Sequence, residues 1–198
     1  MHETTTFGEI ILLKHRIWTR LDSTCLWIED IVENQGFRAT PHMFLQHFIL
    51  GFPLVDTTAR LVLPDHLTQP RDTTTAAGLT DCCKFCEPYL GFQEQVFYHD
   101  LTPGPDGRVK VSLVNPSFNS GYRLGMTLRY LKSYYPILVE WKMLSAGTYV
   151  IGLEPANCRV GGRCVEREAG TLQMLQPQEL RTYAIEVEFF NQYGRGSE

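Results

Sequence analysis

Three segments of the chain alternate apolar and polar residues with the period of a β-strand. They are Arg108–Val114, Tyr122–Tyr130 and Glu179–Asn191. Successive side chains of a strand point to opposite faces of its sheet. The alternation therefore predicts three strands that each bury one face and expose the other.

Further segments are rich in β-branched and aromatic residues between turn-forming residues. Residues 21–24 and 104–107 have turn composition, so the strands on either side of each turn are expected to pair antiparallel. The remaining predicted strands of this type are Phe7–Arg20, Cys25–Glu33, Ala59–Pro64, Glu94–Leu101 and Tyr135–Met143. No convincing amphipathic helix is found. This pattern predicts an all-β, antiparallel, sandwich-like fold, and 198 residues are typical of one domain, here residues 1–198.

Two apolar runs lack alternation and predict strands that are buried on both faces. Thr148–Leu153 leads directly into Glu154, and Pro155 is expected to end the strand because proline has no N–H to donate. His42–Val55 is predicted to be a central strand with His47 in its middle. A carboxylate or an imidazole at such positions can serve as an acid or base in a cleft. Alternatively, Glu154 begins an exposed turn and His47 is a core residue with satisfied hydrogen bonds.

Residues 65–92 lose all periodicity and predict a long loop, which we interpret as the rim of a functional site. The loop carries Cys82, Cys83 and Cys86. A zinc site that draws on a distant fourth ligand is one interpretation of these cysteines. Reduced thiols are the favoured one, because no histidine lies nearby and no secretory signal is seen.

Composition narrows the possible partners. The net charge of −4 and the absence of a Lys/Arg run argue against nucleic acid and against an anionic membrane surface. The apolar runs are too short to span a bilayer, and the first residues do not resemble a signal peptide. We therefore expect a cytoplasmic protein.

Motifs for phosphate binding or nucleophilic serine chemistry are missing from the sequence. What is left is acid–base chemistry from a histidine and a carboxylate, on a frame whose 12% aromatic residues suit stacking against sugar rings.

Several stretches resemble the less-characterised bacterial and fungal branch of the aldose 1-epimerase (galactose mutarotase-like) superfamily. The resemblance covers nearly the whole chain. It is carried by residues 42–54, 94–100, 141–143 and 152–158, with Gly162-Arg163, Arg167-Glu168 and Gly170.

The resemblance implies the antiparallel β-supersandwich of that superfamily and interconversion of the α and β anomers of an aldose. It implies Glu154 as the general base and His47 as the general acid, without a metal or an organic cofactor. The residues it implies as contacts to the sugar hydroxyls are Gln95, His99, Asp100, Lys142 and Asn157.

Members of this superfamily are usually longer at the N-terminus, so the resemblance also implies a partial sandwich that lacks the first strands. Uncovered strands would favour association between copies, and we expect weak activity or none from this chain.

Two other functions stay open at this stage. One is a carbohydrate-binding protein on the same fold without turnover, and the other is an all-β interaction module in which His47 and Glu154 are unrelated. A glycoside hydrolase is disfavoured because it needs two carboxylates around the scissile bond, and only Glu154 is a good candidate.

Overall fold

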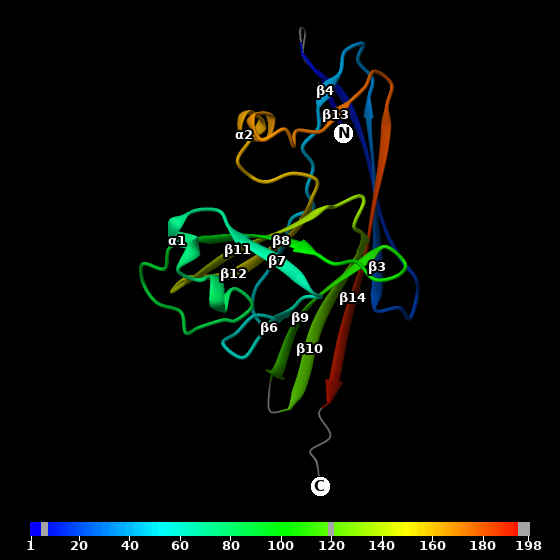
Figure 1. Ribbon diagram of the computed structural model, residues 1–198. Helices are drawn as coiled ribbons and strands as arrows, with labels where there is room; N and C mark the ends of the chain where they lie inside the picture. Colours follow the sequence, from blue (N-terminus) through cyan, green and yellow to red (C-terminus); the bar gives the residue numbers. More distant parts are fainter. Residues whose placement is uncertain (5–7, 119–120, 194–198) are drawn as a thin grey trace.

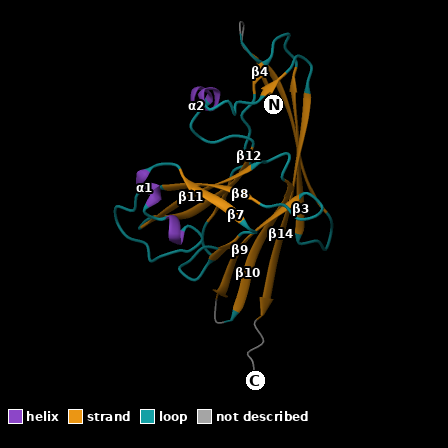
Figure 2. Ribbon diagram, viewed as in Figure 1, coloured by secondary structure: helices purple, strands orange, loops and turns teal. Residues whose placement is uncertain are grey.

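A computed structural model describes residues 1–4, 8–118 and 121–193 of the chain. Two antiparallel sheets make up most of it, with a third sheet of two short strands. Figures 1 and 2 show the strands of one main sheet running across those of the other. The predicted all-β antiparallel sandwich is thus confirmed.

The larger sheet has seven strands and includes the three alternating segments. Its order is β1 (His2–Thr4), β2 (Ile10–Thr19), β3 (Cys25–Asn34), β14 (Leu180–Tyr193), β10 (Tyr122–Leu131), β9 (Arg108–Phe118) and β6 (Arg60–Val62). The first residue of the predicted strand Phe7–Arg20 lies outside the described residues.

The smaller main sheet has five strands and carries most of the predicted site residues. Its order is β5 (Phe48–Leu50), β12 (Thr148–Ala156), β11 (Ile137–Ser145), β8 (Gln95–Leu101) and β7 (His66–Pro70). The two-stranded sheet pairs β13 (Met174–Leu175) with β4 (Thr40–Pro41).

The main core lies between the two large sheets. Leu138, Ile151 and Leu153 from the five-stranded sheet pack with residues such as Leu113 and Leu128 from the seven-stranded sheet. We call this side of the five-stranded sheet its inner face. The outer face carries a separate apolar cluster that includes Val96, Tyr98 and Val139. Neighbouring residues along a strand therefore belong to different environments.

Three local predictions were wrong. The apolar run His42–Val55 forms a strand only at β5, and His47 lies in the preceding loop. Residues 65–92 include β7, helix α1 (Thr73–Ala76) and the 3₁₀ helix η1 (Leu79–Asp81). Pro155 does not end β12: it pairs with Leu138, and its carbonyl accepts a hydrogen bond from the Gln46 N–H at 3.0 Å.

Helices are short in the part of the chain that the structure describes, and α2 (Arg163–Glu168) is the longest of them. No helix among the described residues is long and apolar enough to cross a membrane.

Candidate functional site

The end of β12 brings Glu154 to the outer face of the five-stranded sheet, where it meets His47. His47 Nε2 lies 3.0 Å from Glu154 Oε1. The Glu154 side chain is 5% exposed, whereas that of His47 is 43% exposed. A strand therefore fixes the carboxylate, and a loop presents the imidazole to solvent. The structure brings together the two residues that the sequence suggested as base and acid.

Gly152 provides the space for this pair. It lies two residues before Glu154 on the same face of β12, opposite Trp141 of β11. A Cβ atom added at Gly152 would lie 2.8 Å from Glu154 Oε1 and 3.1 Å from His47 Cε1. These approaches are shorter than van der Waals contact, so a side chain here would displace the carboxylate or the imidazole.

The electrostatics of Glu154 are set by two opposing effects. Burial in the sheet raises the pKa of Glu154, because removing water disfavours the charged carboxylate. The neighbouring His47 opposes this shift through its positive charge. The pair is thus a carboxyl group of increased basicity beside a partner that can carry a proton.

Two aromatic residues continue the outer face beyond this pair. Trp141 lies beside Gly152, and its indole N–H donates to Glu94 Oε2 at 2.9 Å. Arg71 Nη2 donates to the other oxygen of Glu94, also at 2.9 Å. These two hydrogen bonds, that of Trp141 first, lower the pKa of Glu94. Trp141 therefore presents a fixed ring with a charged group at its edge.

Tyr98 is the second aromatic residue and lies in the same row as Glu154. Val139 pairs with Glu154 on one side and with Tyr98 on the other, and Tyr98 pairs with Gln69 of β7. Side chains of such laterally paired residues share a face. Asp100 also belongs to the outer face, two residues after Tyr98, where it forms an ion pair with Lys132.

Gln95, His99 and Lys142 lie on the inner face, away from Glu154, so their predicted role as sugar contacts beside that residue is corrected. His99 is fully buried, with Nε2 2.8 Å from Glu140 Oε2 and Nδ1 2.9 Å from Thr68 Oγ1. The physical reason is the two-residue period: β8 alternates Gln95 and His99 against Tyr98 and Asp100.

Lys142 is committed to the segment that carries the cysteines. Its ammonium group donates to the carbonyls of Asp81, Cys82 and Lys84 at 3.1, 2.7 and 2.7 Å. The Lys142 side chain is 3% exposed. Lys142 therefore holds this segment in place. Among the described residues, no group of three metal-ligating side chains lies close enough together to bind a metal ion.

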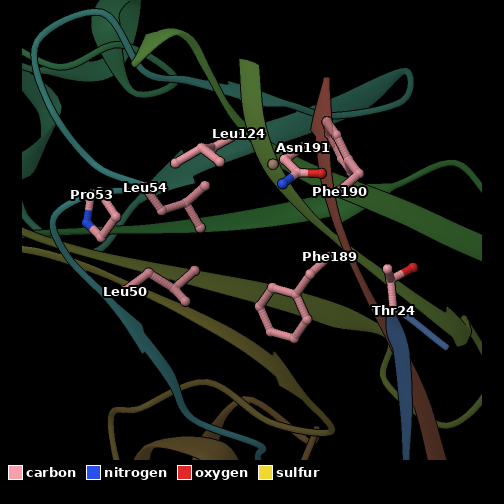
Figure 3. A pocket seen from close by; sticks show the side chains of 9 residues that line it. Thr24, Leu50, Pro53, Leu54, Leu124, Phe189, Phe190 and Asn191 are labelled. Carbon is pink, nitrogen blue, oxygen red and sulfur yellow. The ribbon is translucent and has the colours of Figure 1, made fainter. Parts of the chain in front are cut away.

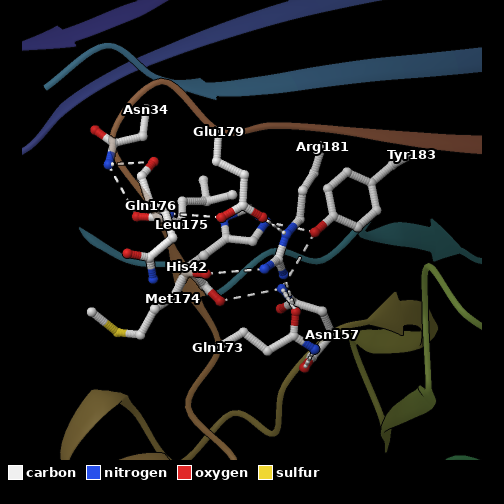
Figure 4. A network of polar contacts seen from close by, with 10 residues as sticks. All are labelled: Asn34, His42, Asn157, Gln173, Met174, Leu175, Gln176, Glu179, Arg181 and Tyr183. Atoms are coloured by element: carbon white, nitrogen blue, oxygen red, sulfur yellow. Dashed lines mark hydrogen bonds and ion pairs between the residues drawn. The ribbon is translucent and has the colours of Figure 1, made fainter. Parts of the chain in front are cut away.

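Asn157 is likewise structural in this arrangement. Its side-chain oxygen accepts from the Phe44 N–H at 2.7 Å, and its amide group donates to the His42 carbonyl at 3.2 Å. Asn157 is 4% exposed. Figure 4 shows it within a network that includes Gln173, Arg181 and Tyr183. This network anchors the loop that carries His47, so Asn157 supports the site without facing it.

The molecule also has an apolar groove. This groove of about 450 Å³ lies between β5 and the end of β14. Figure 3 shows Leu50, Leu54 and Phe189 lining it, together with Leu124. Its lining offers few polar groups to orient a sugar, so the outer face of the five-stranded sheet is the stronger candidate site.

Sequence reasoning missed Trp141, Tyr98, Glu94 and Gln69 as members of this face. The alternation within β8 does separate Tyr98 from His99. To decide which of these two residues points toward the site, one needs the register between β8, β11 and β12. The sequence alone does not give this register.

Comparisons with other proteins place this fold. A family model described as a domain of unknown function, DUF4432, matches residues 1–189. None of the curated proteins compared with the chain is significantly similar in sequence.

Solved structures give a consistent picture. A "putative aldose 1-epimerase" from Klebsiella pneumoniae matches with a TM-score of 0.88 at 19% identity, over 95% of this chain and 48% of that one. A galactose mutarotase-related enzyme from Lactobacillus acidophilus matches with a TM-score of 0.57 at 10% identity, over 100% of this chain and 73% of that one. A galactose mutarotase-like protein from Clostridium acetobutylicum matches with a TM-score of 0.53 at 13% identity, over 98% of this chain and 65% of that one.

At these low sequence identities the structural similarity establishes the fold alone, which is the galactose mutarotase-like β-sandwich. The chain spans about half the length of the Klebsiella protein and about two thirds of the Clostridium protein.

Proposed function

This chain is a member of the DUF4432 family, and we propose that it binds a monosaccharide on the outer face of the five-stranded sheet and interconverts its anomers. The observation that carries the proposal is the 3.0 Å contact between His47 and Glu154. The two residues are far apart in the sequence, and they meet on an accessible face of a galactose mutarotase-like fold.

In the proposed reaction Glu154 is the general base. Its carboxylate removes the proton of the anomeric hydroxyl, and the resulting oxygen lone pair forms the aldehyde as the bond from C1 to the ring oxygen breaks. His47 donates its proton to that ring oxygen. After rotation about the bond from C1 to C2, the sugar recloses on the other face of the aldehyde with both proton transfers reversed, so the protein ends as it began.

The protonation states that this reaction needs agree with the environment of the pair. An imidazole can carry a proton near neutral pH, and a partly desolvated carboxylate is a better base than one in water. Burial raises the pKa of Glu154, and the charge of His47 limits that rise so that the carboxylate can still ionise.

The sugar has to separate the two side chains, because their contact leaves no room between them. Glu154 is held in β12, whereas His47 is 43% exposed and lies in a loop. We therefore expect the imidazole to swing outward on binding. The anomeric hydroxyl and the ring oxygen are both bonded to C1, so the required displacement is small.

Groups along the outer face would hold the sugar. Trp141 offers a ring surface for the apolar side of a pyranose. Glu94 and Gln69 offer hydrogen-bond acceptors on the same face. Asp100 stays a candidate contact at the far end of the face. Gln95, His99, Lys142 and Asn157 are left out, because their side chains face the core or are committed to protein groups.

The test is the anomerisation rate of a panel of aldoses, measured by polarimetry or by exchange NMR. General acid–base groups typically contribute about 10²- to 10⁴-fold. Glu154→Gln should therefore lower the catalysed rate at least a hundredfold while sugar binding persists. Glu168→Gln, an exposed residue of α2 with the same chemical change, should keep the rate. A Glu154→Gln rate close to that of the unmodified protein would overturn the assignment.

A second candidate is a carbohydrate-binding protein without turnover. It is favoured by the short His47–Glu154 contact itself, because this ion pair has to be broken before either side chain can transfer a proton to or from a sugar. Under this alternative the unmodified protein binds an aldose but does not accelerate its anomerisation, and Glu154→Gln has no rate to lose.

A further inference from the structure

Beyond the His47–Glu154 pair, the outer face leads to a cavity of about 360 Å³ at the β7 edge of the sheet. Tyr98 and Gln69 line it, and so do Asp100, Lys132 and Arg159. Ligand cavities start at roughly this size and carry a few oriented polar groups. The cavity lies on the same sheet face as Glu154, so one ligand can contact both.

The guanidinium of Arg159 is held at this cavity by two side-chain contacts, and its backbone by a third. Its Cζ lies 4.9 Å from the centre of the Tyr98 ring, and its Nη2 donates to Gln69 Oε1 at 2.5 Å. The Arg159 backbone N–H donates to Glu166 Oε1 at 3.2 Å. Glu166 is 2% exposed and is itself fixed by a hydrogen bond from Thr171. The arginine is therefore pre-positioned before any ligand arrives.

The charge of Arg159 has no carboxylate partner among the side chains that the structure describes. The other cation of the cavity, Lys132, forms an ion pair with Asp100. The three charged groups that line the cavity thus leave one net positive charge, which comes from Arg159. A guanidinium with unused N–H donors matches the planar geometry of a carboxylate.

We propose that Arg159 binds the carboxylate of a sugar acid, so that the substrate class is the hexuronic acids. This inference rests on the proposed function for the anomeric end of the same sugar. The single net charge matches a monoanion better than the dianion of a phosphate ester.

The spacing along the sheet fits this class of substrate. Glu154 and Tyr98 lie on strands separated only by β11, so their backbones are roughly 10 Å apart. A hexuronate carries C1 and the carboxylate-bearing C5 on the two sides of its ring oxygen. One ring with a hydrogen bond at each end spans about this backbone separation.

The experiment compares affinities for D-glucuronate, D-galacturonate, the matching neutral hexoses and glucose 6-phosphate, by calorimetry or ligand-observed NMR. The Glu154→Gln protein is used so that binding is measured without turnover. A uronate should bind about tenfold or more tightly than its neutral hexose, since hydrogen bonds between charged groups are among the stronger ones. Arg159→Gln should lower this ratio of affinities by about tenfold or more.

Two further variants make the test specific. Arg159→Lys keeps the charge but loses the planar fork, so it should restore only part of the ratio. Arg167→Gln removes the same charge from the exposed side of α2 and should leave the ratio unchanged. Thermal unfolding of each variant checks that it is folded.

The outcomes separate this inference from the proposed function. Uronate binding that depends on Arg159 but without catalysed anomerisation upholds the carboxylate subsite and overturns the mutarotase. Anomerisation with no preference for uronates, or with a ratio insensitive to Arg159→Gln, overturns the subsite alone. Tighter binding of glucose 6-phosphate than of the uronates also overturns it, and a failure of every sugar to bind overturns both.

Discussion

Two histidine–glutamate pairs lie on opposite faces of the same five-stranded sheet. In the outer pair, His47 is 43% exposed and Glu154 is 5% exposed. In the inner pair, His99 and Glu140 are both fully buried, 2.8 Å apart. The same two chemical groups thus meet at nearly the same distance, but only one pair is open to a ligand.

Access to solvent, rather than residue type or spacing, therefore separates a candidate site from a structural pair. The inner pair has further buried partners: Thr68 hydrogen-bonds His99, and the ammonium of Lys142 lies 4.0 Å from Glu140 Oε1. Within the described parts of the chain, that carboxylate oxygen has no hydrogen-bond partner. The inner pair is therefore expected to matter for stability, and the outer pair for chemistry.

Removing the inner carboxylate should have the largest effect on stability. Glu140→Ala leaves Lys142 buried without its nearest carboxylate and removes the Nε2 partner of His99, and breaking such a buried pair costs about 3–5 kcal/mol. The free energy of unfolding from urea titration measures this loss. Glu154→Ala is the matched change on the outer face and should cost clearly less. Equal losses for the two variants would contradict the assignment of a structural role to the inner pair.

A third histidine, His42, differs from those of both pairs, because no ion pair joins it to a carboxylate among the described residues. Its Nε2 meets the Tyr183 hydroxyl (Figure 4). Burial, aided by the charge of Arg181, lowers the pKa of His42 to about 4. The unfolded chain therefore takes up a proton on this residue as the pH falls from about 6.5 to 4, before the folded state does.

The folded state should consequently lose about 3 kcal/mol of stability over that pH range because of His42. Stability is retained above pH 6.5, where the residue is neutral in both states. Urea unfolding at several pH values should show this loss in the unmodified protein, and His42→Asn should reduce it. An unchanged pH dependence in His42→Asn would contradict the assignment to this residue.

Gly152→Ala should disturb the outer pair. Its methyl group would lie 2.8 Å from Glu154 Oε1, 3.1 Å from His47 Cε1 and 3.3 Å from Trp141 Cβ, so the carboxylate and the imidazole have to shift. If the proposed function holds, the anomerisation rate should fall about tenfold, which is less than the roughly 10²- to 10⁴-fold expected when an acid–base group is lost entirely. At Gly51 an added methyl meets its nearest atoms only at 3.5 Å, so Gly51→Ala is the control. Equal rates for the two variants would speak against the pair.

The sequence predicted the regular part of the fold well, because alternation directly reports a sheet with one buried face. Strands β9, β10 and β14 lie where the patterns of 108–114, 122–130 and 179–191 place them. The prediction of a strand over His42–Val55 was wrong because a loop that packs its side chains into the core is as apolar as a buried strand. For example, the centre of the Phe44 ring lies 4.6 Å from the centre of the Tyr183 ring. Strand β7 was missed because its sequence, His-Leu-Thr-Gln-Pro, is largely polar.

The candidate site was only partly predictable for a related reason. The resemblance to a known superfamily pointed to His47 and Glu154, and the structure brings the two together. The predicted sugar contacts came from both faces of the sheet. The sequence alone could not separate them, because the positions of His99 and Tyr98 relative to Glu154 depend on the pairing of three strands. Arg159 could not be placed at all, since its side chain reaches across the sheet from an irregular segment.

The central claim is that a sugar binds at the outer pair and not elsewhere on the sheet. Its most direct test is an NMR titration with hexoses and hexuronates that follows the imidazole signals of His47 and His99, each assigned by substitution. Binding at the outer pair should give saturable shifts of the His47 signals and leave the His99 signals unchanged. Saturable binding that leaves His47 unmoved, or that shifts His99 alone, would contradict this claim.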